Sequence, residues 1–188
     1  MTKSFVMSPG GPVAAIGATT ESHPLTNYYS GVELLKRLSG KYRRLGDLWL
    51  EIPRLGVKMA IVGVPVSGNT WDVTWLGDQA GWLNGTAYPA SAGNSVLTGH
   101  VYLPNGRPGP FVKLNTLWWG DKIIVHVGDS QYTYEVRSVQ QIAPGSIATA
   151  LKHETLPWLT LLTCKGFDQA TNSYTYRIIV RAVLVSGK

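Results

Sequence analysis

The chain has 188 residues, enough for one domain with a sizeable buried core. Its single cysteine excludes a disulfide-stapled scaffold, and no apolar run reaches the roughly 18–20 residues of a membrane-spanning helix. The net charge of +6 is not accompanied by a nucleic-acid-binding motif, so we expect no nucleic-acid partner; an anionic cell wall or membrane surface suits this charge better.

In chain order, residues 1–28 are rich in glycine, proline, serine and threonine, which predicts a flexible N-terminal segment. Residues 29–188 then form one domain. It begins with a helix over residues 29–39, where Val32, Leu34, Leu35 and Leu38 recur at helical spacing. After residue 48 the pattern changes to short apolar runs separated by glycine and proline, which are typical of strands and turns.

About eight short strands are predicted. They cover residues 48–52, 57–64, 73–76, 94–102, 122–127, 131–139, 158–163 and 178–185. Short helical turns fit residues 111–117 and 147–151, the second inside a long connection over residues 143–158. Almost no strand–helix–strand spacing occurs, so we predict an all-β fold, an eight-stranded closed β-barrel with short helices and one N-terminal helix.

The candidate chemistry centres on Cys164, which ends the apolar run at residues 159–164. A nucleophilic cysteine needs a partner that takes or shares its proton, and a positive group where negative charge develops. His100 is the best partner among the four histidines, because it follows Gly99 at the end of an apolar strand. A buried, inert thiol is the other interpretation of a lone cysteine.

Two arginines in the last strand compete for the positive group. Arg177 and Arg181 share strand parity and lie roughly 13 Å apart at about 3.3 Å per residue, so only one can meet the thiol. Arg177 is nearer to the Cys164 end, whereas a salt-bridged position suits Arg181 better. We expect no metal and no cofactor, because there is no cluster of histidine and cysteine at ligand spacing and no phosphate-cradling glycine loop.

The ordered set of motifs resembles the sortases, the cysteine transpeptidases of bacterial surfaces. The resemblance rests on L-T-L-L-T-C at residues 159–164, Arg177 after twelve intervening residues, and T-G-H at residues 98–100. Further matches are I-P-R-L-G-V at 52–57, G-T-A-Y-P at 85–89, G-N-S at 93–95 and G-P-F at 109–111. The similarity spans roughly residues 48–185, and the set as a whole is specific.

This resemblance implies that Cys164, His100 and Arg177 converge at one end of a groove. Sorting-signal peptides of the Leu-Pro-x-Thr-Gly (LPxTG) type would be cleaved between Thr and Gly through a thioacyl enzyme, which an amine of peptidoglycan or a pilin resolves. By position, Thr98, Thr160, Leu162 and Thr163 match substrate-binding residues of the family. The connection at 143–158 corresponds to its specificity loop.

Family members usually carry a membrane anchor, so we expect one outside this sequence, joined through the helix at 29–39, and a location at the extracellular face of the cell membrane. The region of residues 85–87 and the lack of a lid-like extension lean toward class D, E or F. With unperturbed pKa values, under ~1% of the enzyme would hold the thiolate–imidazolium pair at neutral pH. Arg177 would raise that fraction by lowering the pKa of the thiol.

Two other functions fit parts of the sequence. An L,D-transpeptidase-like enzyme is one, but its Ser-His-Gly-Cys arrangement is missing, since Cys164 follows Thr163. A non-catalytic module that binds the cell wall through tryptophans is the other, with Trp118 and Trp119 or Trp71 and Trp75 stacking on sugars.

Overall fold

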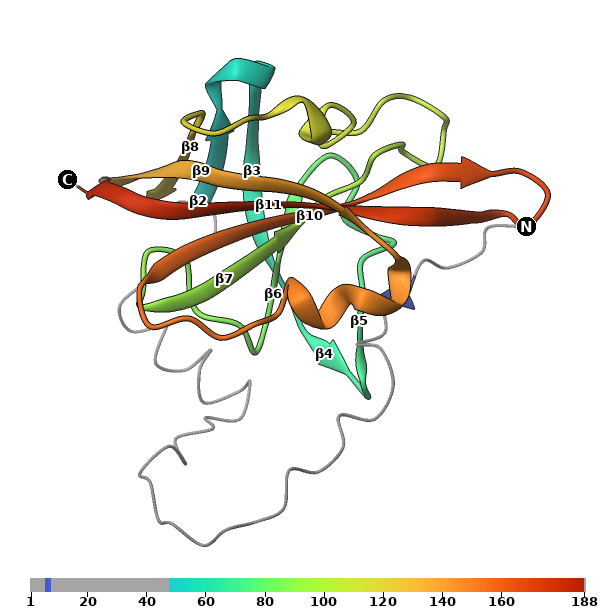
Figure 1. Ribbon diagram of the computed structural model, residues 1–188, viewed down its shortest axis with the longest axis horizontal. Helices are drawn as coiled ribbons and strands as arrows, with labels where there is room; N and C mark the ends of the chain where they lie inside the picture. Colours follow the sequence, from blue (N-terminus) through green and yellow to red (C-terminus); the bar gives the residue numbers. More distant parts are fainter. Residues whose placement is uncertain (1–5, 8–47, 188) are drawn as a thin grey trace, which may run out of the picture.

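A computed structural model describes residues 6–7 and 48–187, and eight of its strands close into a barrel (Figure 1). The order around the barrel is β10-β11-β9-β8-β2-β3-β6-β7. The barrel strands are β2 (Leu48–Ile52), β3 (Val57–Val64), β6 (Ala80–Leu83), β7 (Gly93–Thr98), β8 (Lys122–Val127), β9 (Ser130–Ile142), β10 (Pro157–Asp168) and β11 (Ser173–Gly187). This architecture confirms the predicted all-β closed barrel of eight strands.

A three-stranded sheet of β1 (Val6–Met7), β5 (Thr70–Asp72) and β4 (Val66–Ser67) lies beside the barrel. The predicted helix at 29–39 and the remainder of the predicted flexible segment lie outside the described residues. The strand predicted at 73–76 is wrong. The side chain of Asp72 accepts hydrogen bonds from the backbone N–H and the hydroxyl of Thr74, which turns the chain out of the sheet at this point.

Three short 3-10 helices complete the described residues: η2 (Pro53–Leu55), η3 (Leu114–Thr116) and η4 (Pro144–Thr149). The predicted helical turns near residues 111–117 and 147–151 therefore exist, with shifted bounds. None of the helices in the described part of the chain is long and apolar enough to cross a membrane.

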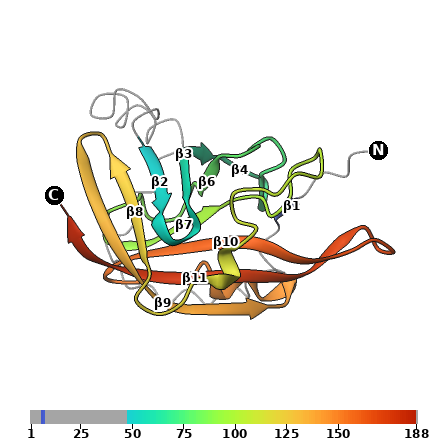
Figure 2. The same ribbon diagram turned by 90° about the horizontal axis from the view of Figure 1, so that it is seen from above.

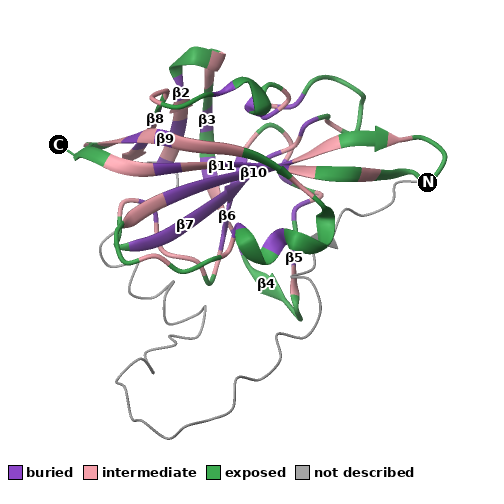
Figure 3. Cartoon of the chain, in the orientation of Figure 1, coloured by how far each residue is buried: buried purple, intermediate pink, exposed green. Residues whose placement is uncertain are grey.

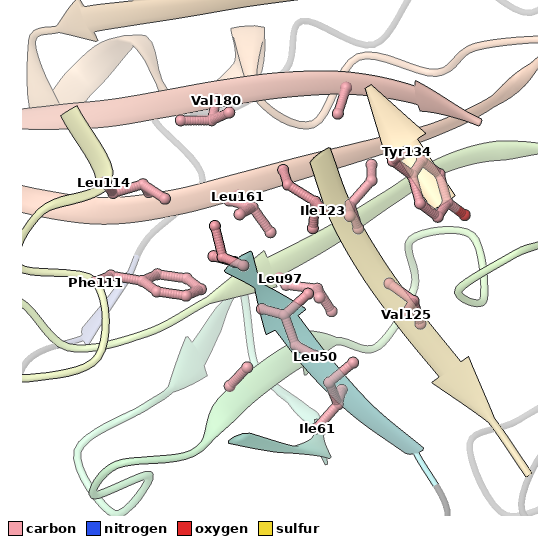
Figure 4. Close-up of a cluster of buried hydrophobic side chains, with 14 of the residues drawn as sticks. Leu50, Ile61, Leu97, Phe111, Leu114, Ile123, Val125, Tyr134, Leu161 and Val180 are labelled. Atoms are coloured by element: carbon pink, nitrogen blue, oxygen red, sulfur yellow. The ribbon is translucent and has the colours of Figure 1, made fainter. Parts of the chain in front are cut away.

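Two buried clusters lie on opposite faces of the barrel wall. One fills the interior, where side chains such as Leu97, Leu161 and Val180 converge (Figure 4). Alternate residues of the same strands point outward, and Val96, Leu162 and Ile179 form the second, outer cluster with Ile147 of η4 and with Ala150. The purple stretches of β7 and β10 in Figure 3 mark strands that are buried on both faces.

The last two strands run past the barrel as a two-stranded hairpin. β10 pairs with β7 only as far as Leu162 and continues to Asp168, paired with β11 alone. Both views show this hairpin projecting from the barrel (Figures 1 and 2). Both strands are longer than predicted, because the hairpin is largely exposed and its polar residues carry no apolar pattern.

Candidate active site

Cys164 and Arg177 face each other where the hairpin leaves the barrel. They are direct partners in the antiparallel register of β10 and β11, so their side chains lie on the same face. The guanidinium of Arg177 donates through Nη1 to the backbone carbonyls of Tyr174, at 3.3 Å, and Tyr176, at 3.0 Å. The hairpin backbone therefore holds the positive group at the same end of β10 as the thiol.

His100 reaches this end through the neighbouring strand. β7 and β10 run parallel, and their last partners are Thr98 and Leu162. His100 lies two residues beyond Thr98, and Cys164 lies two residues beyond Leu162, so the two lie at the same edge, where β7 ends and β10 continues into the hairpin. The backbone N–H of Gly99 donates to the carbonyl of Leu162 at 3.3 Å, which continues the ladder past the last strand pair.

Two threonine hydroxyls form hydrogen bonds between the end of β7 and the adjacent part of β10. Thr98 Oγ1 donates to the carbonyl of Leu162 at 3.1 Å, and Thr163 Oγ1 donates to the carbonyl of Gly99 at 2.7 Å. Both threonines are buried, where an unpaired hydroxyl would be costly. The residues immediately before His100 and Cys164 are thus tied to each other.

Two glycines, Gly99 and Gly109, allow close packing around the backbone of His100. A Cβ at Gly99 would lie 2.9 Å from the ring of Phe111, and a Cβ at Gly109 would lie 2.8 Å from the carbonyl carbon of His100. The carbonyl of His100 also accepts the backbone N–H of Phe111 at 3.1 Å. The backbone of His100 is therefore packed closely between β10 and the segment around residue 110.

Burial and charge act in opposite directions on the thiol. Burial raises the pKa of Cys164 to about 11, and the positive charge of Arg177 offsets only part of that rise. The expected net lowering by Arg177 is therefore not seen. The thiol is almost entirely protonated at neutral pH.

The imidazole is also neutral at rest. Burial lowers the pKa of His100 below its usual 6.5, and a hydrogen bond to the backbone of Val73 opposes part of this effect. Its Nε2 is buried and has no hydrogen-bond partner among the described residues. One ring nitrogen is thus open to a proton from a thiol or a substrate amine.

Arg181 has a different environment from Arg177. Its Nη2 donates to the carboxylate of Glu154 at 2.7 Å, and its guanidinium lies over the ring of Trp158. This is the salt-bridged position that its sequence context indicates. His126 lies on β8, three positions from β10 around the barrel, stacked on Trp49.

A Sortase domain family model matches residues 50–185, nearly the whole barrel. The chain belongs to the sortase family. No match was found among curated proteins.

Solved sortases of several classes share the fold. Sortase A from Corynebacterium diphtheriae, a lid mutant, aligns with a TM-score of 0.67 at 24% identity over 85% of this chain and 81% of its own. Sortase C-3 from Streptococcus pneumoniae aligns with a TM-score of 0.61 at 22% identity over 75% and 63%. The Sortase D5 transpeptidase of Clostridium perfringens aligns with a TM-score of 0.61 at 20% identity over 81% and 89%. This sortase therefore spans 63% of the length of the pneumococcal structure.

The four predicted substrate-binding residues are all buried in this sortase. Leu162 lies in the outer cluster, and Thr98 and Thr163 make the edge bonds described above. Thr160 donates to the side chain of Asn94 at 2.7 Å. Their contact with a substrate stays a prediction, whereas their contribution to the frame around Cys164 is visible in these bonds.

Asn94 and Gly109 stand in two of the matched motifs, but sequence reasoning assigned neither of them a role. Asn94 is a polar residue inside a fully buried strand, and that mismatch was the available signal. Nothing in the local pattern around Gly109 points to its contact with His100, which comes from tertiary packing. The described residues contain no group of three or more histidine, cysteine or acidic side chains that would hold a metal ion.

Proposed function

We propose that this sortase is a cysteine transpeptidase that cleaves LPxTG-type sorting signals between Thr and Gly. The observation that carries the proposal is the strand register, with Arg177 directly opposite Cys164 and His100 at the same edge of the adjacent strand. Sortase membership supports the reaction class.

In the first step, the Cys164 thiol passes its proton to Nε2 of His100, and the sulfur attacks the Thr carbonyl carbon. The C–N bond to Gly then breaks, and the imidazolium gives its proton to the leaving amine. A thioester remains on Cys164. Arg177 stabilises the oxyanion that develops on the carbonyl oxygen.

In the second step, an amine of peptidoglycan or a pilin attacks the thioester, and its proton passes to His100 and then to the departing sulfur. At pH 7 a thiol with a pKa of about 11 is ionised in roughly one molecule in ten thousand, so proton transfer to His100 must accompany attack. We expect slow turnover for this reason.

The partners follow from this chemistry. Sorting-signal peptides and wall amines are found outside the cell membrane, so we propose that the enzyme works at that face, held by an anchor. The assignment to class D, E or F remains a proposal from the sequence, because the solved structures above belong to classes A, C and D.

The test incubates the protein with a panel of Leu-Pro-x-Thr-Gly peptides and an amine such as triglycine, with Cys164→Ala as the matched control. We expect the Thr–amine product from the wild type alone, and a mass adduct on Cys164 equal to the acyl fragment when the amine is omitted. Cleavage of a tetrapeptide stem instead would favour an L,D-transpeptidase. Glycan binding that persists in Cys164→Ala, with no peptide cleavage, would favour a wall-binding module.

A further inference from the structure

The side chain of Asn94 forms a three-way junction beneath the surface of the protein. Its Nδ2 donates to the backbone carbonyls of Ala150, at 2.8 Å, and Lys152, at 2.9 Å, while its Oδ1 accepts the hydroxyl of Thr160 at 2.7 Å. Asn94 is 4% exposed. Both amide hydrogens and the amide oxygen are therefore used, in a place where no water competes.

The three bonds join β7 and β10 to the segment that follows η4. This segment, residues 150–156, connects η4 to β10 over the outer face of the barrel. A second attachment is the backbone N–H of Gly93, which donates to the carbonyl of Leu156 at 3.2 Å. The ion pair of Arg181 with Glu154 is a third, although partly exposed pairs of this kind contribute little.

The junction anchors a segment whose first residue, Ala150, packs in the outer buried cluster together with Ile147 of η4. Ile147 and Ala150 belong to the same buried cluster as Leu162 and Ile179. Leu162 and Cys164 share one face of β10 and lie about 7 Å apart along the strand. A displacement of residues 150–156 therefore disturbs the cluster that contains Leu162, the neighbour of Cys164 on this face.

We infer that Asn94 is a positioning residue that fixes residues 150–156, the segment after η4, as a wall of the peptide-binding groove. This inference rests on the proposed function, because it assumes that a peptide lies along the face of Cys164. Asn94 lies on β7, six residues before His100, which is about 20 Å at strand spacing. It therefore acts through residues 150–156 and does not touch the reacting atoms.

The test uses two substitutions that keep shape but remove different bonds. Asn94→Asp retains the acceptor for Thr160 and loses both N–H donors, and Thr160→Val removes the hydroxyl that fixes the amide. Thr160→Ser is the conservative variant that keeps the hydroxyl, and Gln131→Glu makes the same amide-to-carboxylate change at an exposed position of β9. Thermal unfolding first verifies that each variant is folded.

We expect the backbone amides of residues 150–156 to exchange with deuterium about tenfold faster in Asn94→Asp and Thr160→Val, while those of residues 158–162 stay protected. KM for the sorting peptide should rise about tenfold with kcat changed less than about threefold, because the site of bond cleavage is untouched. The rate of Cys164 alkylation by iodoacetamide should stay the same. Gln131→Glu should match the wild type in all three measurements, and Thr160→Ser, which keeps the hydroxyl, should restore the wild-type exchange of residues 150–156.

The inference is overturned if the folded variants keep wild-type exchange in residues 150–156, or if exchange rises while KM stays unchanged. It is also overturned if kcat falls and KM does not, since that result would place Asn94 in the chemistry. Should Asn94→Asp fail to fold, Thr160→Val decides between these outcomes. If the wild type cleaves no peptide, the proposed function fails, and the exchange data still decide whether Asn94 holds the segment.

Discussion

Arg177 lies directly opposite Cys164 in the register of β10 and β11, while Arg181, on the same face of β11, is paired with Glu154. The two arginines have the same strand parity, but different side chains and backbone groups surround them. The hairpin backbone orients Arg177 at the edge where the thiol lies. Arg181 instead attaches the segment before β10 to the barrel.

The first prediction compares these two arginines. Arg177→Ala should lower kcat/KM for the sorting peptide by about 10²–10³-fold, because an electrostatic donor to the developing oxyanion is lost. Arg181→Ala should retain most of kcat, because it removes a partly exposed ion pair and a contact with the Trp158 ring, and its partner in the strand register is Thr160, not Cys164. Steady-state kinetics on one peptide measures both. A larger loss from Arg181→Ala than from Arg177→Ala would reverse the assignment.

The second prediction concerns the pH dependence of the thiol. Because burial raises the pKa of Cys164 to about 11, the rate of its alkylation by iodoacetamide should keep rising beyond pH 10. A free thiol, with a pKa near 8.5, levels off well before that pH. The same protein unfolded in urea is the control. A plateau of the folded protein near pH 8.5 would contradict the burial of the thiol.

The pH dependence of kcat/KM for the sorting peptide should reflect the pKa values of both His100 and Cys164. The pKa of His100 lies below 6.5, so the acid limb of the kcat/KM profile should fall below pH 6.5, where the imidazole becomes protonated before it can take the thiol proton. The alkaline limb should fall only near pH 11. The profile is measured with one peptide across pH 5–11, and an acid limb above pH 7 would oppose the lowered pKa.

The third prediction tests the packing around His100. Gly109→Ala places a methyl group against the carbonyl of His100, and since backbone atoms must move, we expect a loss of about 1–3 kcal/mol in stability and at least tenfold in kcat/KM. Gly63→Ala is the matched control, because its Cβ would meet the side chain of Asn84 at 3.2 Å, which can shift. Equal activity of both variants would show that the Gly109 contact does not position His100.

The fourth prediction tests the bond that ties the two strand ends together. Thr163→Val keeps the side-chain shape and removes the hydroxyl that donates to Gly99, so the free energy of unfolding should fall by about 1–3 kcal/mol because a buried carbonyl loses its donor. kcat should fall with it, as His100 and Cys164 lose their relative placement. Thr163→Ser should restore both values in urea unfolding and peptide turnover. Failure of the serine variant to recover kcat would assign the effect to packing.

Local patterns were sufficient for some of the strands that pack against the core, but not for β6, which is fully buried and lies outside the predicted strands. Alternation and turn residues predicted β2, β3 and β8 with their observed bounds, because their apolar positions record which face is buried. The same reasoning shortened β10 and β11, because the hairpin at their ends is largely exposed and has no alternation of buried apolar positions. It also misplaced the strand at 73–76, since a side chain of Asp72 turns the chain.

By itself, the sequence determined which groups are available: one thiol, a histidine at the end of an apolar strand, and two arginines of equal parity. Only the tertiary structure decided their surroundings. Strand register placed Arg177 opposite Cys164, and Glu154 reached Arg181 from the preceding segment. The pKa values of the thiol and the imidazole depend on burial by residues distant in sequence, and the role of Thr160 depends on Asn94, 66 positions away. These are long-range contacts, and no local periodicity encodes which of them form.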